Sequence, residues 1–183
     1  RNIGTTFETR PDWCRPRDIE EMLRLGATKV ELGVQSLDED LLVRMKRGHK
    51  VEDAAQASAN LREAGLKVGF HMMPGLPGSS PDLDLAVFRE LFSDSRFRPD
   101  YLKIYPTLVI VGTELYRQNL RGEYTPLGDD DAGELVSRNK EPLPRYVRLQ
   151  RVQRDIPSPL IVAGVKKSNL RQLAKKRLED RGS

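Results

Sequence analysis

Residues 29–36, KVELGVQS, decide the fold of this chain. Two sets of side chains alternate along the stretch, with Val30, Leu32 and Val34 on one face and Glu31, Gly33 and Gln35 on the other. This period of two is typical of a β-strand with one apolar and one polar face. Amphipathic runs at 16–26 and 51–65 flank the stretch, each ending on a glycine. A strand between two helices predicts a βαβ unit and a parallel sheet.

The same pattern continues in both directions along the chain. Further strands are expected at 3–8, 67–73, 101–106 and 146–153, and further helices at 36–45, 80–92, 113–122, 129–139 and 168–178. The predicted fold class is therefore α/β, with four βα units in residues 1–112. A helical and basic C-terminal extension of the same domain follows over residues 113–183. In each strand one face is apolar and is expected to pack on helices, while the opposite face is polar. That polarity favours an open barrel that holds a ligand over a closed, packed one.

Polar residues gather where the predicted strands end, which is where parallel α/β proteins bind ligands. The Glu8 carboxylate suits the two hydroxyls of a ribose, and an ion pair with Arg10 fits equally well. Gln35 can donate and accept at once, as a nucleoside or amino-acid site requires and as a satisfied buried amide does. Lys103 points either to an anionic ligand or to an internal carboxylate, for which Glu31 is the candidate partner.

The thiol and imidazole content limits the metal chemistry of this chain. Cys14 is the only cysteine, so an internal disulfide and a multi-thiolate metal site are both excluded, and a reducing, cytoplasmic setting is expected. Its simplest role is that of a small packing residue. Of the two histidines, His49 is favoured as a cap of a helix end, with substrate contact as the alternative. His71 is favoured as functional, with a structural role as the alternative. No metal ligand set is predicted.

The charge distribution points to a phosphate-rich partner. The 183 residues carry a net charge of +4, but residues 138–181 hold 13 Lys or Arg against 4 Asp or Glu, leaving −5 for the rest. Such a basic segment suits nucleic acid, although a solvated helix face has the same composition. No apolar run approaches the roughly 20 residues that cross a bilayer, so no membrane contact is expected.

Six ordered motifs carry a family resemblance: ETRPDWC (8–14), ELGVQS (31–36), RGHK (47–50), HMMPGLPG (71–78), KIYPT (103–107) and VQRDIP (152–157). Together they resemble the catalytic subunit of the Elongator complex and its single-chain homologues, which are radical S-adenosylmethionine tRNA uridine acetyltransferases. The resemblance implies part of a (βα)6 partial barrel, comprising its units 3 to 6. It also implies the addition of a carboxymethyl group to C5 of the wobble uridine of tRNA. In that chemistry a deoxyadenosyl radical takes hydrogen from the methyl group of acetyl-CoA.

The resemblance also implies roles for individual residues. Glu8, Gln35, Met73 and Pro74 would bind S-adenosylmethionine, and Lys103 and Tyr105 would face the reacting centre. The residues expected to meet tRNA phosphates are Arg145, Arg148, Arg151, Arg154, Lys166 and Lys167. The 4Fe–4S cluster would take its ligands from three cysteines before residue 1, and the acetyltransferase domain would follow residue 183. This chain alone is therefore expected to be inactive.

Two other functions compete with this one. A porphyrin oxidase of the radical class shares the GVQS and GLPG themes but has no need of a basic segment. A tRNA-binding scaffold without catalysis would keep the basic segment and lose turnover. The expected partners are tRNA and either accessory subunits of the Elongator type or a second copy of the chain.

Overall fold

The main sheet has five parallel strands. The computed structural model of the protein describes residues 3–166 and 169–182, and the sheet runs in the order β1–β2–β3–β4–β6. Its strands are β1 (Thr6–Thr9), β2 (Lys29–Gln35), β3 (Lys67–Met72), β4 (Tyr101–Ile104) and β6 (Arg148–Val152). A second, antiparallel pair is formed by β5 (Val109–Ile110) and β7 (Ile161–Ala163), and the sequence pattern did not predict it. The expected α/β class with a parallel sheet is confirmed.

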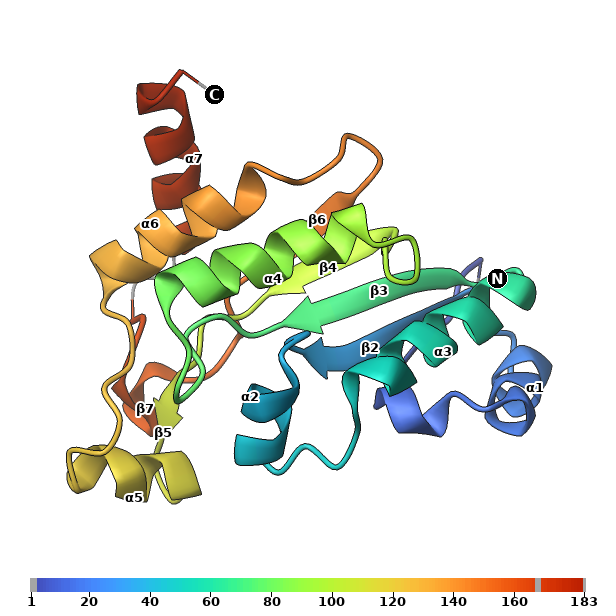
Figure 1. The fold of residues 1–183 in the computed structure, drawn as a ribbon, viewed down its shortest axis with the longest axis horizontal. Helices are drawn as coiled ribbons and strands as arrows, with labels where there is room; N and C mark the ends of the chain where they lie inside the picture. The colour runs from blue at the N-terminus through green and yellow to red at the C-terminus, as the bar shows by residue number, and fades with distance from the viewer. Residues whose placement is uncertain (1–2, 167–168, 183) are drawn as a thin grey trace.

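Helices connect the strands and cover one face of the sheet. They are α1 (Pro16–Arg24), α2 (Glu39–Arg44), α3 (Val51–Glu63), α4 (Pro81–Ser93), α5 (Glu114–Leu120), α6 (Asp129–Lys140) and α7 (Leu170–Asp180), with 3-10 turns η1 (Pro11–Trp13) and η2 (Ser158–Leu160). In Figure 1, α3 and α4 lie across the same face of the sheet. Helix α6 packs against both α4 and α7. The opposite face of the sheet is left for polar side chains.

Local chemistry fixes where the helices begin. Ser80 caps α4 by accepting a hydrogen bond from the Leu83 amide at 3.2 Å, and Pro81 occupies the first turn as predicted. Ser36 and Glu39 have the spacing of a capping box, which would start the helix predicted at 36–45, but the structure does not form this box. Asp38 caps α2 instead, accepting from the Leu41 amide at 2.8 Å, while the Ser36 hydroxyl accepts from Asp38. An ST-turn therefore precedes the helix and delays its start.

The first strand is shorter than the sequence pattern predicts. Pairing with β2 begins at Thr6, opposite Lys29, and the Ile3 side chain is 96% exposed. Ile3 belongs to the stretch 3–8 that was predicted as a strand, but β1 begins only at Thr6. The Thr5 amide donates to the Thr28 hydroxyl instead, at 3.1 Å. The ordered sheet thus starts three residues later than expected.

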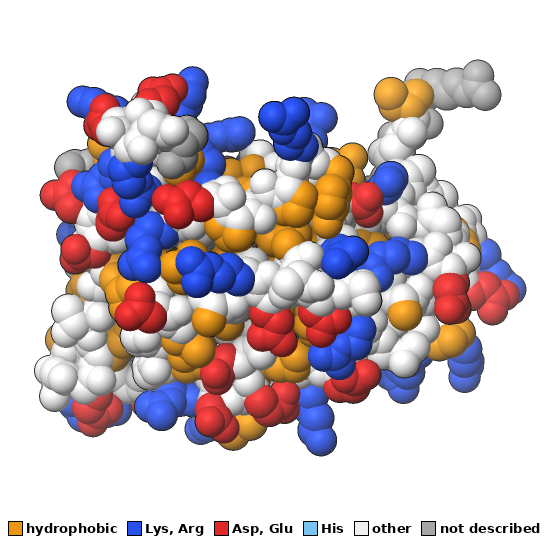
Figure 2. All heavy atoms as spheres, turned by 45° about the horizontal axis from the view of Figure 1, so that its top comes forward, with side chains coloured by type: hydrophobic (Ala, Val, Ile, Leu, Met, Phe, Trp, Pro, Cys, Tyr) orange, Lys and Arg blue, Asp and Glu red, His pale blue; other side chains and the backbone are white. Residues whose placement is uncertain are grey.

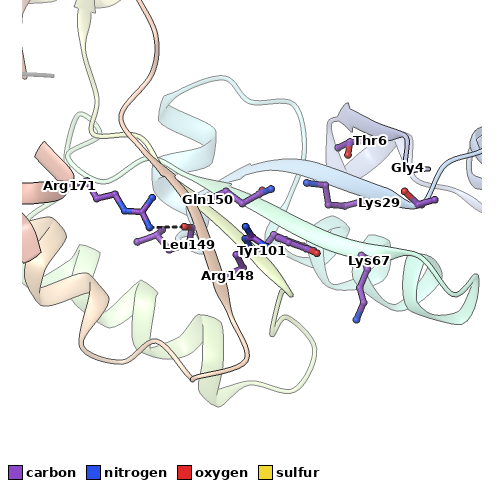
Figure 3. Close-up of a pocket in the computed structure, with 10 residues that line it drawn as sticks. Gly4, Thr6, Lys29, Lys67, Tyr101, Arg148, Leu149, Gln150 and Arg171 are labelled. Atoms are coloured by element: carbon purple, nitrogen blue, oxygen red, sulfur yellow. Dashed lines mark hydrogen bonds between the residues drawn. The ribbon is translucent and has the colours of Figure 1, made fainter. Parts of the chain in front are cut away.

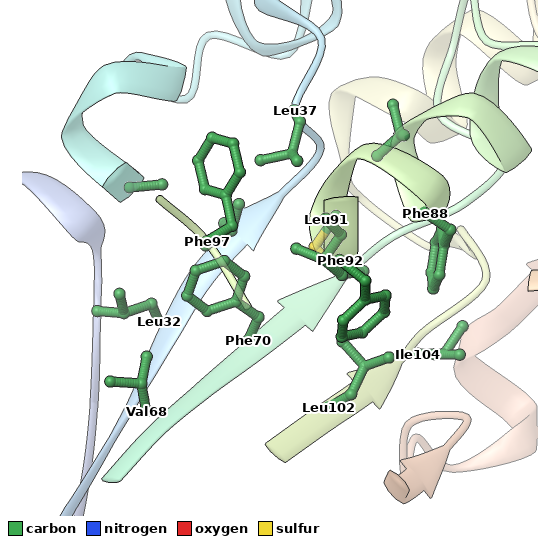
Figure 4. Packing of buried hydrophobic residues seen from close by; sticks show 14 of the residues in the cluster. Leu32, Leu37, Val68, Phe70, Phe88, Leu91, Phe92, Phe97, Leu102 and Ile104 are labelled. Carbon is green, nitrogen blue, oxygen red and sulfur yellow. The ribbon is translucent and has the colours of Figure 1, made fainter. Parts of the chain in front are cut away.

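The hydrophobic core lies between the sheet and the helices. The apolar faces predicted for β2, β3 and β4 are all buried, and Figure 4 shows Leu32, Phe70 and Leu102 from successive strands facing Leu91 of α4. Phe70 is 0% exposed at the centre of this layer. Strand alternation therefore places apolar atoms on the helices and leaves polar atoms on the other face.

The basic segment contributes a strand to the sheet. β6 pairs in parallel with β4, with Tyr101 opposite Arg148 and Ile104 opposite Val152. The predicted strand at 146–153 is thereby confirmed, and the sheet continues past residue 112. Residues 105–147 form the connection between β4 and β6, and β5, α5 and α6 lie within it.

Replacing Phe70 with alanine should lower the free energy of unfolding by about 3–5 kcal/mol, because the fully buried ring leaves a cavity in the core. Urea unfolding followed by circular dichroism measures this. Ile3→Ala is the control and should change stability by less than about 0.5 kcal/mol. Equal losses for the two variants would contradict the packing described for β3.

Candidate active site

A cavity of about 890 Å³ opens at the carboxyl ends of β1, β2, β3 and β4. Its wall includes Glu8, Gln35, His71, Met73 and Tyr105. A smaller cavity of about 450 Å³ shares Glu8, Tyr105 and Arg154 with it and adds Lys103 and Arg151. The strand ends therefore meet at one hollow, as the parallel topology requires.

Glu31 is the centre of the polar face beneath this cavity. It is 3% exposed, and its Oε1 accepts from Lys29 Nζ at 2.7 Å. Its Oε2 accepts from His71 Nε2 at 2.8 Å and from Lys103 Nζ. Gln150 of β6, with its amide oriented to match these neighbours, donates to Oε1 at 3.1 Å. The predicted pair of Lys103 and Glu31 is confirmed.

The electrostatics of Glu31 follow from these contacts. Burial alone would raise its pKa, but the hydrogen bonds from His71, Lys103 and Lys29 outweigh burial and hold the pKa well below its usual range. The carboxylate is therefore ionised at neutral pH. It compensates the charges of two ammonium groups that are 15% and 18% exposed.

Strand register explains how the sequence builds this group. Glu8 stands opposite Glu31, Glu31 opposite Gly69, and His71 opposite Lys103. A side chain at Gly69 would place its Cβ 3.0 Å from Glu31 Cγ, so the glycine leaves room for the carboxylate. Four side chains, one from each of β1 to β4, thus meet on one face of the sheet: Glu8, Glu31, His71 and Lys103.

His71 links the buried carboxylate to the cavity. Its Nε2 contacts Glu31, and its Nδ1 lies 3.3 Å from Glu8 Oε1. Glu8 is 60% exposed at its side chain, so it keeps carboxylate surface open to the cavity. The alternative partner for Glu8 is wrong, because Arg10 pairs with Asp12 at 2.6 Å.

The same three groups have the composition of a cation site. The ligand atoms of Glu8, Glu31 and His71 lie within 4.8 Å of one another. However, Glu31 already accepts hydrogen bonds from Lys29 and Lys103, so a metal ion would have to displace an ammonium group. The contacts therefore favour a network of ion pairs and hydrogen bonds around Glu31 over a metal centre.

Tyr105 forms the wall next to His71. Their rings meet edge to face with centroids 5.5 Å apart, and the Arg154 guanidinium lies 5.7 Å from the Tyr105 ring centroid. Burial raises the pKa of Tyr105, although nearby Lys103 and Arg151 act in the opposite direction. The phenol is therefore neutral at physiological pH and available as a hydrogen-bond donor.

The remaining residues predicted for the cofactor divide into two groups. Gln35 and Met73 border the cavity, and the Gln35 carbonyl accepts from the Met73 amide at 2.8 Å. Gln35 has a φ of +73°, a conformation that few non-glycine residues adopt and that often marks functional positions. Pro74 is buried outside the cavity wall, where its carbonyl accepts from the Thr107 amide at 3.0 Å.

The PGLPG turn (residues 74–78) is held in place by hydrogen bonds from other parts of the chain. Asp84 of α4 accepts from the Gly75 amide at 2.8 Å and from the Ser79 hydroxyl at 2.7 Å. The Tyr124 hydroxyl donates to the Gly75 carbonyl at 2.7 Å. Both polar backbone atoms of Gly75 are thus occupied, and Leu76 is the turn residue that borders the cavity beside Met73. Burial raises the pKa of Asp84 to about 6.

The arginines and lysines predicted for tRNA do not form one surface. Arg151 and Arg154 border the smaller cavity, whereas Arg148 borders a different cavity of about 610 Å³ at the amino ends of the strands. Figure 3 shows Arg148 there with Lys29, Lys67 and Arg171. Arg145 is exposed between α6 and β6, and Lys166 is exposed after β7. Lys167 lies outside the described residues.

Acidic residues of α6 neutralise part of the basic segment. Arg177 pairs with Asp130 and Glu134 at 3.3 Å, and Arg181 pairs with Glu134 at 2.8 Å. Figure 2 shows red and blue side chains interleaved on the face it presents. Residues 129–134 lie outside the basic segment 138–181, so its charge count leaves these acidic partners out. The folded surface is therefore less basic than the composition of 138–181 suggests.

Trp13 and Arg47 border the cavity without having been predicted there, and His49 supports it in a role other than the predicted one. Trp13 and Arg47 line the cavity, and Arg47 donates to the Gly33 carbonyl at 3.3 Å. His49 is buried, and its Nε2 donates to the Val34 carbonyl at 3.2 Å, so the predicted helix-cap role is wrong. Burial lowers the pKa of His49 and keeps it neutral. Motifs ETRPDWC and RGHK contain all three, but only folding shows which side chains reach the strand ends.

Comparisons with known proteins match the whole chain. The profile of the radical SAM superfamily matches residues 1–88, and that of the radical SAM C-terminal domain matches residues 99–180. The tRNA uridine(34) acetyltransferase of Methanocaldococcus infernus is 50% identical over 100% of this chain and 34% of its own length. Human Elongator complex protein 3 is 46% identical over 98% of this chain and 33% of its own length.

A solved structure matches equally well. The archaeal Elp3 of Methanocaldococcus infernus, with an N-terminal deletion, superposes with a TM-score of 0.96 at 50% identity. The match covers 100% of this chain and 43% of that one. The chain thus spans about a third of the length of the two curated relatives. Within the described residues, no helix is long and apolar enough to cross a membrane.

Replacing Glu31 with glutamine should lower the free energy of unfolding by about 3–5 kcal/mol at pH 7, because two largely buried ammonium groups lose their counter-charge. Denaturant unfolding measures the loss. Because the pKa of Glu31 is lowered by folding, its contribution is present above about pH 4.3 and disappears as pH falls through the folded pKa. The difference between wild type and variant should therefore shrink in acid. Arg24→Gln, which breaks an exposed pair, is the control and should cost less than about 1 kcal/mol.

Replacing Asp84 with asparagine should change how stability depends on pH. The folded pKa of about 6 lies above the ordinary value of 3.8, so the folded chain holds a proton that the unfolded chain loses between these values. Wild-type stability should therefore fall across this window as pH rises, by about 2–3 kcal/mol from this group. Asp84→Asn removes that fall, whereas Asp82→Asn, whose side chain is 90% exposed, retains it. Parallel pH profiles for wild type and Asp84→Asn would refute the assignment.

Proposed function

Since this chain belongs to the radical SAM superfamily, in the family of tRNA uridine(34) acetyltransferase and Elongator complex protein 3, we propose that it forms the central part of a tRNA-modifying catalytic subunit. The proposed reaction adds a carboxymethyl group to C5 of the wobble uridine. The observation that carries this proposal is the 50% identity to a tRNA uridine(34) acetyltransferase over 100% of this chain. The cavity at the strand ends supplies the place for the chemistry.

The proposed S-adenosylmethionine site has the chemistry that such a ligand requires. Glu8 offers a partly exposed carboxylate for ribose hydroxyls, and Gln35 offers an amide that donates and accepts. Met73 adds an apolar wall. Pro74 lies behind that wall, so its proposed role is to hold the Met73 backbone. When bound with a reduced 4Fe–4S cluster, S-adenosylmethionine supplies the radical chemistry of the superfamily.

The residues of this chain do not fit the cluster itself. Cluster iron is held by several cysteine thiolates, and the sequence has one cysteine. Cys14 is 2% exposed, and burial raises its pKa to about 12, which opposes the thiolate form.

Lys103 and Tyr105 are the proposed catalytic groups. Glu31 holds the Lys103 ammonium in place, while the neutral Tyr105 phenol stands at the boundary of the two cavities. Their role is to orient an anionic or carbonyl-bearing substrate by hydrogen bonds. Acetyl-CoA is the proposed co-substrate, because the similar archaeal protein is named an acetyltransferase.

The RNA contact is proposed for the part of the basic surface nearest the cavity. Arg154 borders both cavities and has no carboxylate partner among the described residues, and Arg151 borders the smaller one beside Asp155. Phosphates near the reacting uridine would meet these side chains first. Arg145, Arg148, Lys166 and Lys167 are proposed as outer contacts. Elongator-type accessory subunits or self-association are proposed for assembly, and the cytoplasm for location.

The proposal is tested on the native protein that carries this chain, reconstituted anaerobically with iron and sulfide. We expect tRNA with uridine at position 34 to yield a carboxymethylated nucleoside by mass spectrometry, and tRNA with cytidine there to remain unchanged. Glu8→Gln should weaken S-adenosylmethionine binding about 10- to 100-fold in equilibrium dialysis, because a charged acceptor is lost. Glu20→Gln, on the exposed face of α1, should bind normally.

Two results would overturn the proposal. Turnover of a porphyrin with no change in tRNA would support the rival oxidase. Tight, salt-dependent tRNA binding without deoxyadenosine formation in a protein that holds its cluster would support a non-catalytic scaffold.

A further inference from the structure

Trp13 is an exposed aromatic side chain on a rigid turn at the cavity mouth. It is 55% exposed and borders the cavity of about 890 Å³ together with Arg10 and Arg47. Large apolar side chains are usually buried, and a tryptophan left this open at a concave site is informative about binding. No ring stacking or cation–π contact involves it among the described residues.

The turn that carries Trp13 is fixed on both sides. Pro11 and Cys14 are buried, and the Cys14 carbonyl accepts from Asn60 Nδ2 of α3 at 3.1 Å. Arg10, just before the turn, donates to Asp12 at 2.9 and 2.6 Å and to the Gly48 carbonyl at 3.3 Å. The indole therefore stands on a backbone that need not be ordered when a ligand binds, which lowers the entropic cost of binding.

The surroundings of Trp13 match one class of ligand. Arg10 and Arg47 share the cavity wall with it, and Arg154 lies with Tyr105 on the wall of the same cavity. Aromatic faces next to arginines are how proteins hold unpaired nucleobases and the phosphates between them. Arg10 is paired with Asp12, whereas no carboxylate pairs with Arg47 among the described residues, so this wall offers both an indole face and a guanidinium.

We propose that Trp13 is a stacking platform for an unpaired nucleobase of the RNA strand whose uridine enters the cavity. The inference rests on the proposed function and adds a positioning residue to it. A base stacked on Trp13 anchors the strand at the rim near β1, while Arg154 meets a phosphate on the β4 side. The nucleotide between these two contacts is then directed toward Lys103 and Tyr105.

The test measures binding of a seven-nucleotide anticodon-loop RNA that carries 2-aminopurine next to the wobble uridine. Stacking quenches this probe, so its fluorescence should fall on binding to wild type. Trp13→Leu should bind about 5- to 100-fold more weakly and leave the probe bright, whereas Trp13→Phe should retain most of the quenching. Leu25→Ala, which removes an exposed apolar side chain at the end of α1, is the matched control and should behave as wild type.

Salt dependence separates stacking from charge. The slope of log affinity against log salt should be the same for Trp13→Leu and wild type, because the indole carries no charge. Arg154→Gln should reduce that slope by about one. Equal affinity and equal quenching for Trp13→Leu and wild type would overturn the inference while leaving the proposed function intact. Failure of the wild type to bind RNA at all would count against the proposed function as well.

Intrinsic fluorescence gives an independent readout, since Trp13 is the chain's single tryptophan. Without RNA, we expect acrylamide to quench the fluorescence of Trp13 efficiently, and bound RNA should reduce that quenching. Emission that is already protected without RNA would show that protein, not a base, covers the indole, and would overturn the inference.

Discussion

The buried carboxylate of Glu31 is the interaction on which the polar half of the structure depends. It lies on the face of the sheet away from the helices, and it joins side chains from β2, β3, β4 and β6. Without its charge, Lys29 and Lys103 would be unpaired cations with little solvent around them. The network therefore holds four strands in register from the polar side, as Phe70 and its neighbours do from the apolar side.

The same network determines what the cavity can bind. Glu31 binds Nε2 of His71, so Nδ1 faces Glu8, whose exposed carboxylate lies at the end of β1. Lys103 is held as a charged donor below Tyr105. The site thus combines a hydrogen-bond acceptor for sugar hydroxyls with donors for an anionic or carbonyl group, a combination that suits a nucleoside cofactor and a polar co-substrate.

Much of this was predictable because strand alternation is a local property. The apolar faces of β2, β3 and β4 and the strand at β6 follow from a period of two in short stretches of sequence. The pairing of Lys103 with Glu31 was predicted on a different ground, because a buried lysine needs a counter-charge. The start of β1 and the cap of α2 were predicted wrongly because edge pairing and a competing ST-turn decide them. The role of His49 was missed because its partner, the Val34 carbonyl, is 15 residues away.

The charged residues show most clearly the difference between what local sequence predicts and what folding decides. The α/β pattern, the polar strand faces and the family motifs can be read from the sequence alone, because each depends on residue types at fixed short spacing. Only the tertiary structure decided that Asp130 and Glu134 neutralise Arg177 and Arg181, and that Arg148 and Arg154 lie at different cavities. It also decided that Trp13 reaches the cavity mouth. Electrostatic and stacking partners are set by distance in space, and folding brings together residues that no local pattern relates.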